Sequence, residues 1–88
     1  MKISRVNFLN SMDLELNPLE KFLLLDQMDS LDYEPENTQD NMYLKHLIET
    51  MEEQDFHREN PWLTQSVNSA LSKLRYRYTT YLQRIFVS

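Results

Sequence analysis

The 88-residue sequence contains no cysteine and no glycine. Without cysteine, it has no disulfide framework, no thiolate nucleophile and no thiolate ligand for zinc. Without glycine, it lacks the phosphate-binding loops and the nucleophile elbow, whose tight backbone turns depend on that residue. No spacing of serine, histidine and aspartate typical of a hydrolase stands out. We therefore expect a protein that is not an enzyme, uses no cofactor, binds no metal and has no small-molecule substrate.

Long apolar segments are missing as well. The longest uninterrupted apolar run is the four residues Phe22–Leu25, whereas a membrane-spanning helix needs about 18 or more. The first residues are basic but lack the apolar stretch of a secretory signal. Together with the absence of cysteine, this pattern favours a cytoplasmic protein that does not act at a membrane, or one that is exported without a signal peptide.

The sequence does contain enough apolar residues to fold. Leu, Ile, Val and Phe make up 24 of the 88 residues, well above the roughly 20% below which disorder is the better expectation. A domain of this size buries only about 60–65% of the surface of its unfolded chain. We expect one helical domain over residues 1–88, with a thin core that a partner or self-association completes.

The first predicted helix spans residues 18–31. Asn17-Pro18 with Glu20 combines a capping box with proline at the first helical position. The apolar residues of this segment point nearly all round its axis, so we expect the helix to lie centrally, between other surfaces. Residues 1–16 are predicted to form an N-terminal arm or a short helix.

The second predicted helix spans residues 38–54. It follows an acidic loop that contains Pro35, and Asn37 and Thr38 are its candidate caps. Its apolar residues follow the i, i+3, i+4, i+7 pattern of an amphipathic helix with one buried face. They are Leu44, Leu47, Ile48 and Met51.

The third predicted helix, residues 61–86, is the longest and begins at a second Asn-Pro pair, Asn60-Pro61. From Val67 onward its apolar residues are spaced 4-3-4-3-4, which is a heptad seam of nearly three repeats. Because this helix is longer than the other two, we expect one end to project and to offer its apolar stripe to a partner. The candidate partner-binding residues are Val67, Leu71, Leu74, Arg77, Tyr78, Tyr81 and Ile85 of this helix, and Trp62 at its start.

Charge is divided unevenly along the sequence, which has 14 acidic and nine basic residues and a net charge of −5. Residues 61–88 have four bases and no acid, whereas residues 1–60 have the other five bases and all the acids. The first interpretation is internal: acidic faces of the first two helices lie beside the basic third helix and set its register. In the second interpretation, the acids of residues 26–40 form an acidic surface patch that imitates a phosphate backbone or docks on a basic protein.

The third interpretation concerns the Arg/Tyr-rich stretch 75–84, because interleaved arginine and tyrosine can contact phosphates and stack on bases. Tyr78 and Tyr81 belong to the apolar stripe, however, and only Tyr76 points away from it. The net negative charge also disfavours nucleic acid as the partner.

The segment Asp29-Ser30-Leu31-Asp32 resembles the Asp-Ser-Leu core of acyl carrier proteins, in which the serine bears phosphopantetheine. In that family the motif opens a long helix and follows a glycine. Here it closes a predicted helix and the glycine is missing. We therefore expect Ser30 to be a polar residue at a helix end and not a carrier site.

One row of side chains resembles a metal-binding arrangement. It would form along one face if the second helix continued to residue 57, and it consists of His46, Glu49, Glu53 and His57. Because a single helix supplies a flat row and not a closed coordination shell, we expect a solvated face with local pairing of glutamate and histidine.

Together these patterns predict an all-α fold, either a small three-helix bundle or an extended helical hairpin, with a short N-terminal element and a long C-terminal helix. The expected function is the non-enzymatic binding of another protein, as an adaptor, small chaperone or inhibitor. Helix-to-helix burial would supply affinity, with the area provided by the projecting part of the third helix or by the all-round apolar first helix. Acidic faces would steer the encounter with a basic partner. The partner is either a second copy or a different protein. The alternative is an acidic nucleic-acid mimic, or a nucleic-acid binder through the Arg/Tyr-rich C-terminal helix.

Overall fold

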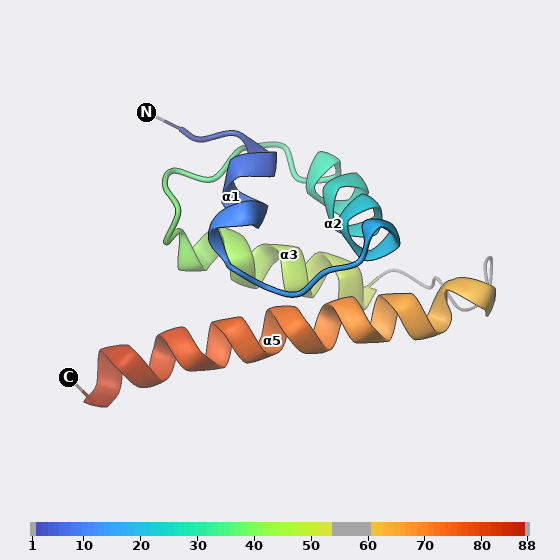
Figure 1. Cartoon of the computed structure of the whole chain (residues 1–88). Coiled ribbons are helices and arrows are strands. Elements are labelled where there is room, and N and C mark those ends of the chain that lie inside the picture. Colours follow the sequence, from blue (N-terminus) through green and yellow to red (C-terminus); the bar gives the residue numbers. More distant parts are fainter. Residues whose placement is uncertain (1, 54–60, 88) are drawn as a thin grey trace.

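The computed structural model describes residues 2–53 and 61–87, without the side chains of Tyr81 and of residues 84–87. Over these residues the fold is all-α, as the sequence predicts (Figure 1). The helices are α1 (Arg5–Ser11), α2 (Pro18–Asp29), α3 (Asn41–Glu53) and α5 (Thr64–Val87), and the 3-10 turn η1 (Pro61–Leu63) precedes α5. No helix among the described residues is long and apolar enough to cross a membrane.

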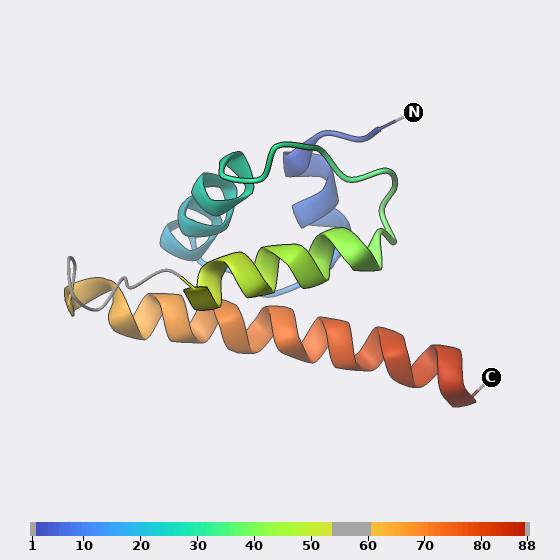
Figure 2. The ribbon, with the colours of Figure 1, turned by 180° about the vertical axis from the view of Figure 1, so that it is seen from behind.

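The long helix α5 is the platform on which the others pack. It contacts both α3 and α2, while α1 contacts α2 (Figure 1). Seen from behind in Figure 2, the C-terminal turns of α5 continue past the first turn of α3. The difference in helix length therefore leaves one end of α5 projecting, in line with the sequence-based expectation.

The N-terminal element is a short helix. Ser4 caps α1, because its Oγ accepts a hydrogen bond from the Asn7 N–H at 3.1 Å. After α1 ends, Asp13 has a φ of 53°, a left-handed conformation that aspartate tolerates better than most residues. This turn sends the chain back along the bundle toward α2. Phe8 and Leu9 of α1 are buried in the core.

The capping box predicted for α2 is confirmed. Asn17 Oδ1 accepts from the Glu20 N–H at 2.8 Å, and Glu20 Oε1 accepts from the Asn17 N–H at 3.0 Å, with Pro18 at the first helical position. The helix ends at Asp29, two residues before the predicted end. The expectation of a central, sandwiched position is wrong, because Phe22 is 67% exposed. Only one side of α2 faces the rest of the bundle.

Helix α3 begins at Asn41, three residues after the predicted start. Its cap is Asp40, whose Oδ1 accepts from the Tyr43 N–H at 3.0 Å. The predicted cap Asn37 instead accepts from the Gln39 N–H at 2.8 Å and closes a turn within the loop. The start is displaced because this local turn occupies the Asn37 side chain and leaves the Asp40 carboxylate to cap the helix.

The core lies between α2, α3 and α5, with α1 packed on α2. Tyr43 is its largest fully buried side chain, and its ring makes edge-to-face contacts with Phe8 and Tyr33, each with ring centroids 5.2 Å apart. The remaining buried apolar residues are Leu9, Met12, Leu23, Leu24, Met28, Leu44, Leu47, Ile48, Met51, Val67, Ala70, Leu71 and Leu74. The apolar face predicted for residues 38–54 is therefore confirmed as a core face.

We expect Leu74→Ala to lower the free energy of unfolding by about 2–5 kcal/mol, because Leu74 is fully buried and its removal leaves a cavity. Tyr76→Ala is the matched control, since Tyr76 lies on the other side of α5 and is 71% exposed; it should change this free energy by less than about 0.5 kcal/mol. Urea unfolding followed by circular dichroism measures both. Equal losses in the two variants would contradict this placement of Leu74.

Candidate functional site

Part of the apolar stripe predicted to bind a partner is used inside the chain. Val67, Leu71 and Leu74 are buried in the core, and Tyr78 packs partly buried against it. A partner would reach the first three only if α5 separated from α2 and α3. The Tyr81 and Ile85 side chains lie outside the described residues. In the described part of α5, the heptad seam therefore joins α5 to its own bundle.

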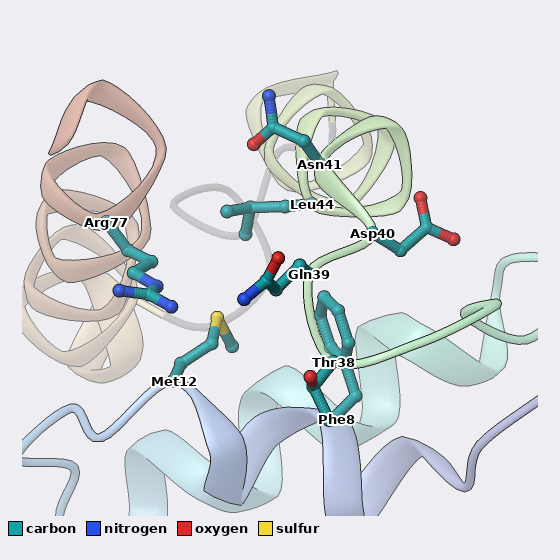
Figure 3. A pocket seen from close by; sticks show the side chains of 8 residues that line it. All are labelled: Phe8, Met12, Thr38, Gln39, Asp40, Asn41, Leu44 and Arg77. Carbon is teal, nitrogen blue, oxygen red and sulfur yellow. The ribbon is translucent and has the colours of Figure 1, made fainter. Parts of the chain in front are cut away.

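Arg77, the charged residue of the predicted site, points into a small cavity between the end of α1, the start of α3 and α5 (Figure 3). The cavity has a volume of about 10 Å³, close to the space that one water molecule needs. The Asp40 carboxylate points away from it in Figure 3. The residues that line it are Phe8, Met12, Thr38, Gln39, Asp40, Asn41, Leu44 and Arg77. This cavity is too small for a metabolite.

Trp62 lies in η1, ahead of α5, and is 75% exposed. A large, exposed indole is compatible with a role at an interface, because tryptophan is enriched among the residues that dominate binding energy.

The most deeply buried charge belongs to Glu20, whose side chain is 1% exposed. Its Oε1 accepts from Lys73 Nζ at 2.8 Å and from the Asn17 N–H at 3.0 Å, and its Oε2 accepts from Ser69 Oγ at 2.7 Å and Lys73 Nζ at 3.0 Å. Lys73 Nζ also donates to the Glu15 carbonyl at 2.6 Å. Both carboxylate oxygens are thus occupied by partners from α2 and α5.

Burial alone would raise the pKa of the Glu20 carboxyl. The hydrogen bonds from Asn17, Lys73 and Ser69, with the Lys73 charge, hold it below the ordinary value of 4.5. A buried carboxylate with a perturbed pKa is a candidate catalytic group in general. Here the pKa is lowered and every oxygen is hydrogen-bonded, so the group is poorly suited to accept a proton and well suited to join two helices.

The internal interpretation of the charge split is confirmed by two ion pairs to α5. Lys73 pairs with Glu20 of α2, and Arg75 pairs with Glu52 of α3 at 3.0 Å. Among the described side chains, α2 and α3 are thus each joined to α5 by an ion pair. Since the Arg75 pair is half-exposed, it contributes to register more than to stability.

The remaining motifs acquire structural roles. Ser30 is the C-terminal cap of α2, so the Asp-Ser-Leu segment closes a helix and does not open one. His46 is hydrogen-bonded through Nδ1 to the Tyr33 hydroxyl and packs edge-on against that ring. The described residues contain no group of three or more side chains arranged to hold a metal ion. His57, the last member of the predicted row, lies outside the described residues.

The candidate functional site is an open groove between α1 and α2, with a volume of about 460 Å³. Val6 of α1 is half-exposed and faces it, and Leu25 of α2 forms the opposite apolar wall. Its lining residues are Ser4, Arg5, Val6, Leu25, Asp29 and Glu34. We call this the α1–α2 groove.

Two further apolar side chains of α2 extend this surface. Phe22 and Leu19 precede Leu25 at three-residue spacing, so the three lie in one row along α2, and Phe22 and Leu19 are exposed. We call this row the α2 outer face. The sequence offered the helix of residues 18–31 as one possible binding surface, but it did not indicate this row, because an apolar pattern on all sides of a helix predicts burial on all sides. The signal available in the sequence was the number of apolar residues in this segment, which exceeds what is needed to pack three helices against one another.

No protein-family model, no curated protein and no solved structure matches the chain. The proposals below therefore follow from its residues and their geometry alone.

We expect Glu20→Gln to lower the free energy of unfolding by about 2–3 kcal/mol at pH 7. The substitution removes the buried negative charge and leaves Lys73 without its partner. Breaking a fully buried ion pair costs roughly 3–5 kcal/mol, and we expect a smaller loss here because Lys73 keeps partial access to water. Glu52→Gln, which removes the half-exposed pair, is the matched control and should cost no more than about 1 kcal/mol. Similar losses of unfolding free energy in the two variants would contradict the conclusion that the buried Glu20 pair matters more than the half-exposed pair.

The same carboxylate predicts a dependence of stability on pH. Because the folded-state pKa of Glu20 lies below its ordinary value of 4.5, its ionised form stabilises the fold above about pH 4.5, and this contribution is lost as the pH falls through the folded-state pKa. The difference in unfolding free energy between the natural chain and Glu20→Gln should be level from pH 7 to about 5 and shrink below about 4.5. A difference that grows as the pH falls would show that the sign is wrong.

Proposed function

We propose that the chain is a non-enzymatic protein-binding module, an adaptor, small chaperone or inhibitor, that packs the α2 outer face and the α1–α2 groove against a partner protein. The observation that carries the proposal is the exposure of Phe22, 67% of whose surface is open to solvent in the middle of the row Leu19, Phe22 and Leu25. Exposed apolar side chains that adjoin one another mark interaction sites more often than single ones do. Aromatic side chains are also enriched among the residues that dominate binding energy.

The proposal keeps the mode of action expected from sequence and replaces the candidate partner-binding residues of the third predicted helix with residues of the first. Helix-to-helix burial still supplies the affinity. Of the two surfaces expected from sequence, on α5 and on α2, the proposal takes the one on α2, because Val67, Leu71 and Leu74 of α5 already belong to the core.

The nucleic-acid alternatives have less support. In the Arg/Tyr-rich stretch, Arg75 is paired with Glu52, Arg77 lines a water-sized cavity and Tyr78 packs on the core, while Tyr76 is exposed. Because most of these side chains make contacts within the fold, the arrangement favours a structural role for them over contact with phosphates. The acids of residues 26–40 do not share one rigid face either. Two of them lie on α2 and four in the following segment, where Asp40 caps α3.

We expect Phe22→Ser to reduce capture of the natural partner from the native cell by about tenfold or more, because it removes the central apolar contact without touching the core. Tyr76→Ser, an equally exposed aromatic on α5, is the matched control and should change capture by less than about twofold. Affinity capture with quantitative mass spectrometry measures both, and circular dichroism checks that both variants stay helical. Capture that survives Phe22→Ser and is lost in Tyr76→Ser would refute the proposal.

A further inference from the structure

We infer that the partner segment is an amphipathic helix whose apolar side lies along the α2 outer face and fills the α1–α2 groove, and whose basic residues meet the acidic C-terminal end of α2. This inference rests on the proposed function and adds the chemical class of the partner. It follows from three features of the surface: its shape, its charge, and an ion pair at its rim.

The shape of the surface suits a helix. Leu19, Phe22 and Leu25 repeat every third residue, and such a row forms a ridge on a helix surface. Beside the ridge, the groove against Val6 offers space for apolar side chains of the opposing element. A ridge next to a groove is the geometry by which amphipathic helices dock, with anchors one turn apart. Because the groove is open to solvent, it suits side chains delivered by a helix better than a small molecule, which needs enclosure.

The charge at one end of the surface is strongly negative. Residues 26–36 contain five acids, Asp26, Asp29, Asp32, Glu34 and Glu36, and no base. All five are exposed and lie near the end of α2 or in the segment that follows, and Asp29 and Glu34 line the groove. The last turn of α2 contains no basic residue. Acids there face the negative end of the helix dipole, an arrangement that costs stability unless cations are near. Basic residues of a partner would offset this repulsion.

One ion pair shows how the acidic end accepts a cation. Arg5 Nη1 lies 2.6 Å from Asp29 Oδ1 at the rim of the groove. The Asp29 side chain nevertheless remains 69% exposed, so it is open to a second cation. Arg5 offsets part of the negative charge that a basic helix would meet at Asp29, so its removal should strengthen binding of such a helix. A role of Arg5 in stability alone would not produce this gain.

The same charge disfavours two other occupants. A second copy that docked through the same surface would bring five acids against five acids, and like charges across an interface oppose association. A membrane rich in anionic lipid would be repelled for the same reason. A basic helix from a different protein combines apolar burial with opposite charge, and it is the occupant to which we commit.

The test uses two synthetic helical peptides of about 18 residues, roughly five turns, with the same leucine face. One has lysine on its polar face, and the other has glutamate. Each is fluorescently labelled and titrated with the full chain at low salt, and amide chemical shifts of the chain locate the site. We expect the lysine peptide to bind at least about tenfold more tightly than the glutamate peptide. The shifts should centre on Val6, Phe22 and Leu25.

Variants of the chain then test the charge contacts. Asp29→Asn should weaken binding of the lysine peptide about two- to fivefold, and Arg5→Gln should strengthen it by a similar factor. Glu53→Gln is the matched control: it removes the same charge from an exposed residue at the end of α3 and should leave binding within about twofold. Circular dichroism verifies that all three variants remain folded.

The outcomes separate this inference from the proposed function. Equal affinity for both peptides, shifts centred on Tyr76, or self-association in place of peptide binding overturns the basic-helix inference. A lysine peptide that fails to bind, while capture of the natural partner still depends on Phe22, also overturns it and leaves the proposed function standing. Capture that does not depend on Phe22 removes the proposed function, whatever the peptides do.

Discussion

The arrangement of α2 depends on one buried carboxylate. Glu20 is held by the start of its own helix through Asn17 and by α5 through Ser69 and Lys73, which lie 49 and 53 residues away in sequence. A carboxylate in a buried position has to keep its partners, because leaving such a charge unpaired costs several kcal/mol. Helix α2 therefore cannot rotate about its axis without breaking this cluster, and the rotation of α2 determines which of its apolar residues face the core.

This constraint explains why a phenylalanine is exposed. Successive residues of an α-helix are about 100° apart, so Phe22 lies about 200° round the axis from Glu20. With Glu20 turned toward α5, Phe22 must face outward, whereas Leu23, Leu24 and Met28 remain on the core side. Covering an exposed apolar side chain of this size is worth about 1.5–3 kcal/mol. The Glu20 cluster, which joins α2 to α5, thus keeps Phe22 exposed, and a partner that covers Phe22 would gain this free energy.

Sequence reasoning was sufficient where a local rule decides the outcome. The capping box at Asn17 and Glu20, the all-α fold, the core face that contains Leu44 and Leu47, and the outward direction of Tyr76 all follow from spacing and capping. It was insufficient where one pattern has two physical solutions. Periodicity shows that Leu71 and Leu74 share a face, but it does not show whether that face meets the chain's own helices or a partner. Nor does residue type show that Glu20 is the buried one among the acids of residues 2–53.

The buried ion pair that stabilises the fold and the exposed carboxylates that would attract a partner therefore lie in different places. The Glu20–Lys73 pair is shielded from solvent on its acidic side, so added salt screens it weakly. Asp29 and the acids that follow α2 are exposed, and their attraction for a basic partner falls as ionic strength rises, with a screening length of about 8 Å near physiological salt. Moderate salt should accordingly weaken binding while the fold persists. The placement of the charges, one acid inside and five around the end of α2, makes this separation possible, because stability and recognition draw on different carboxylates.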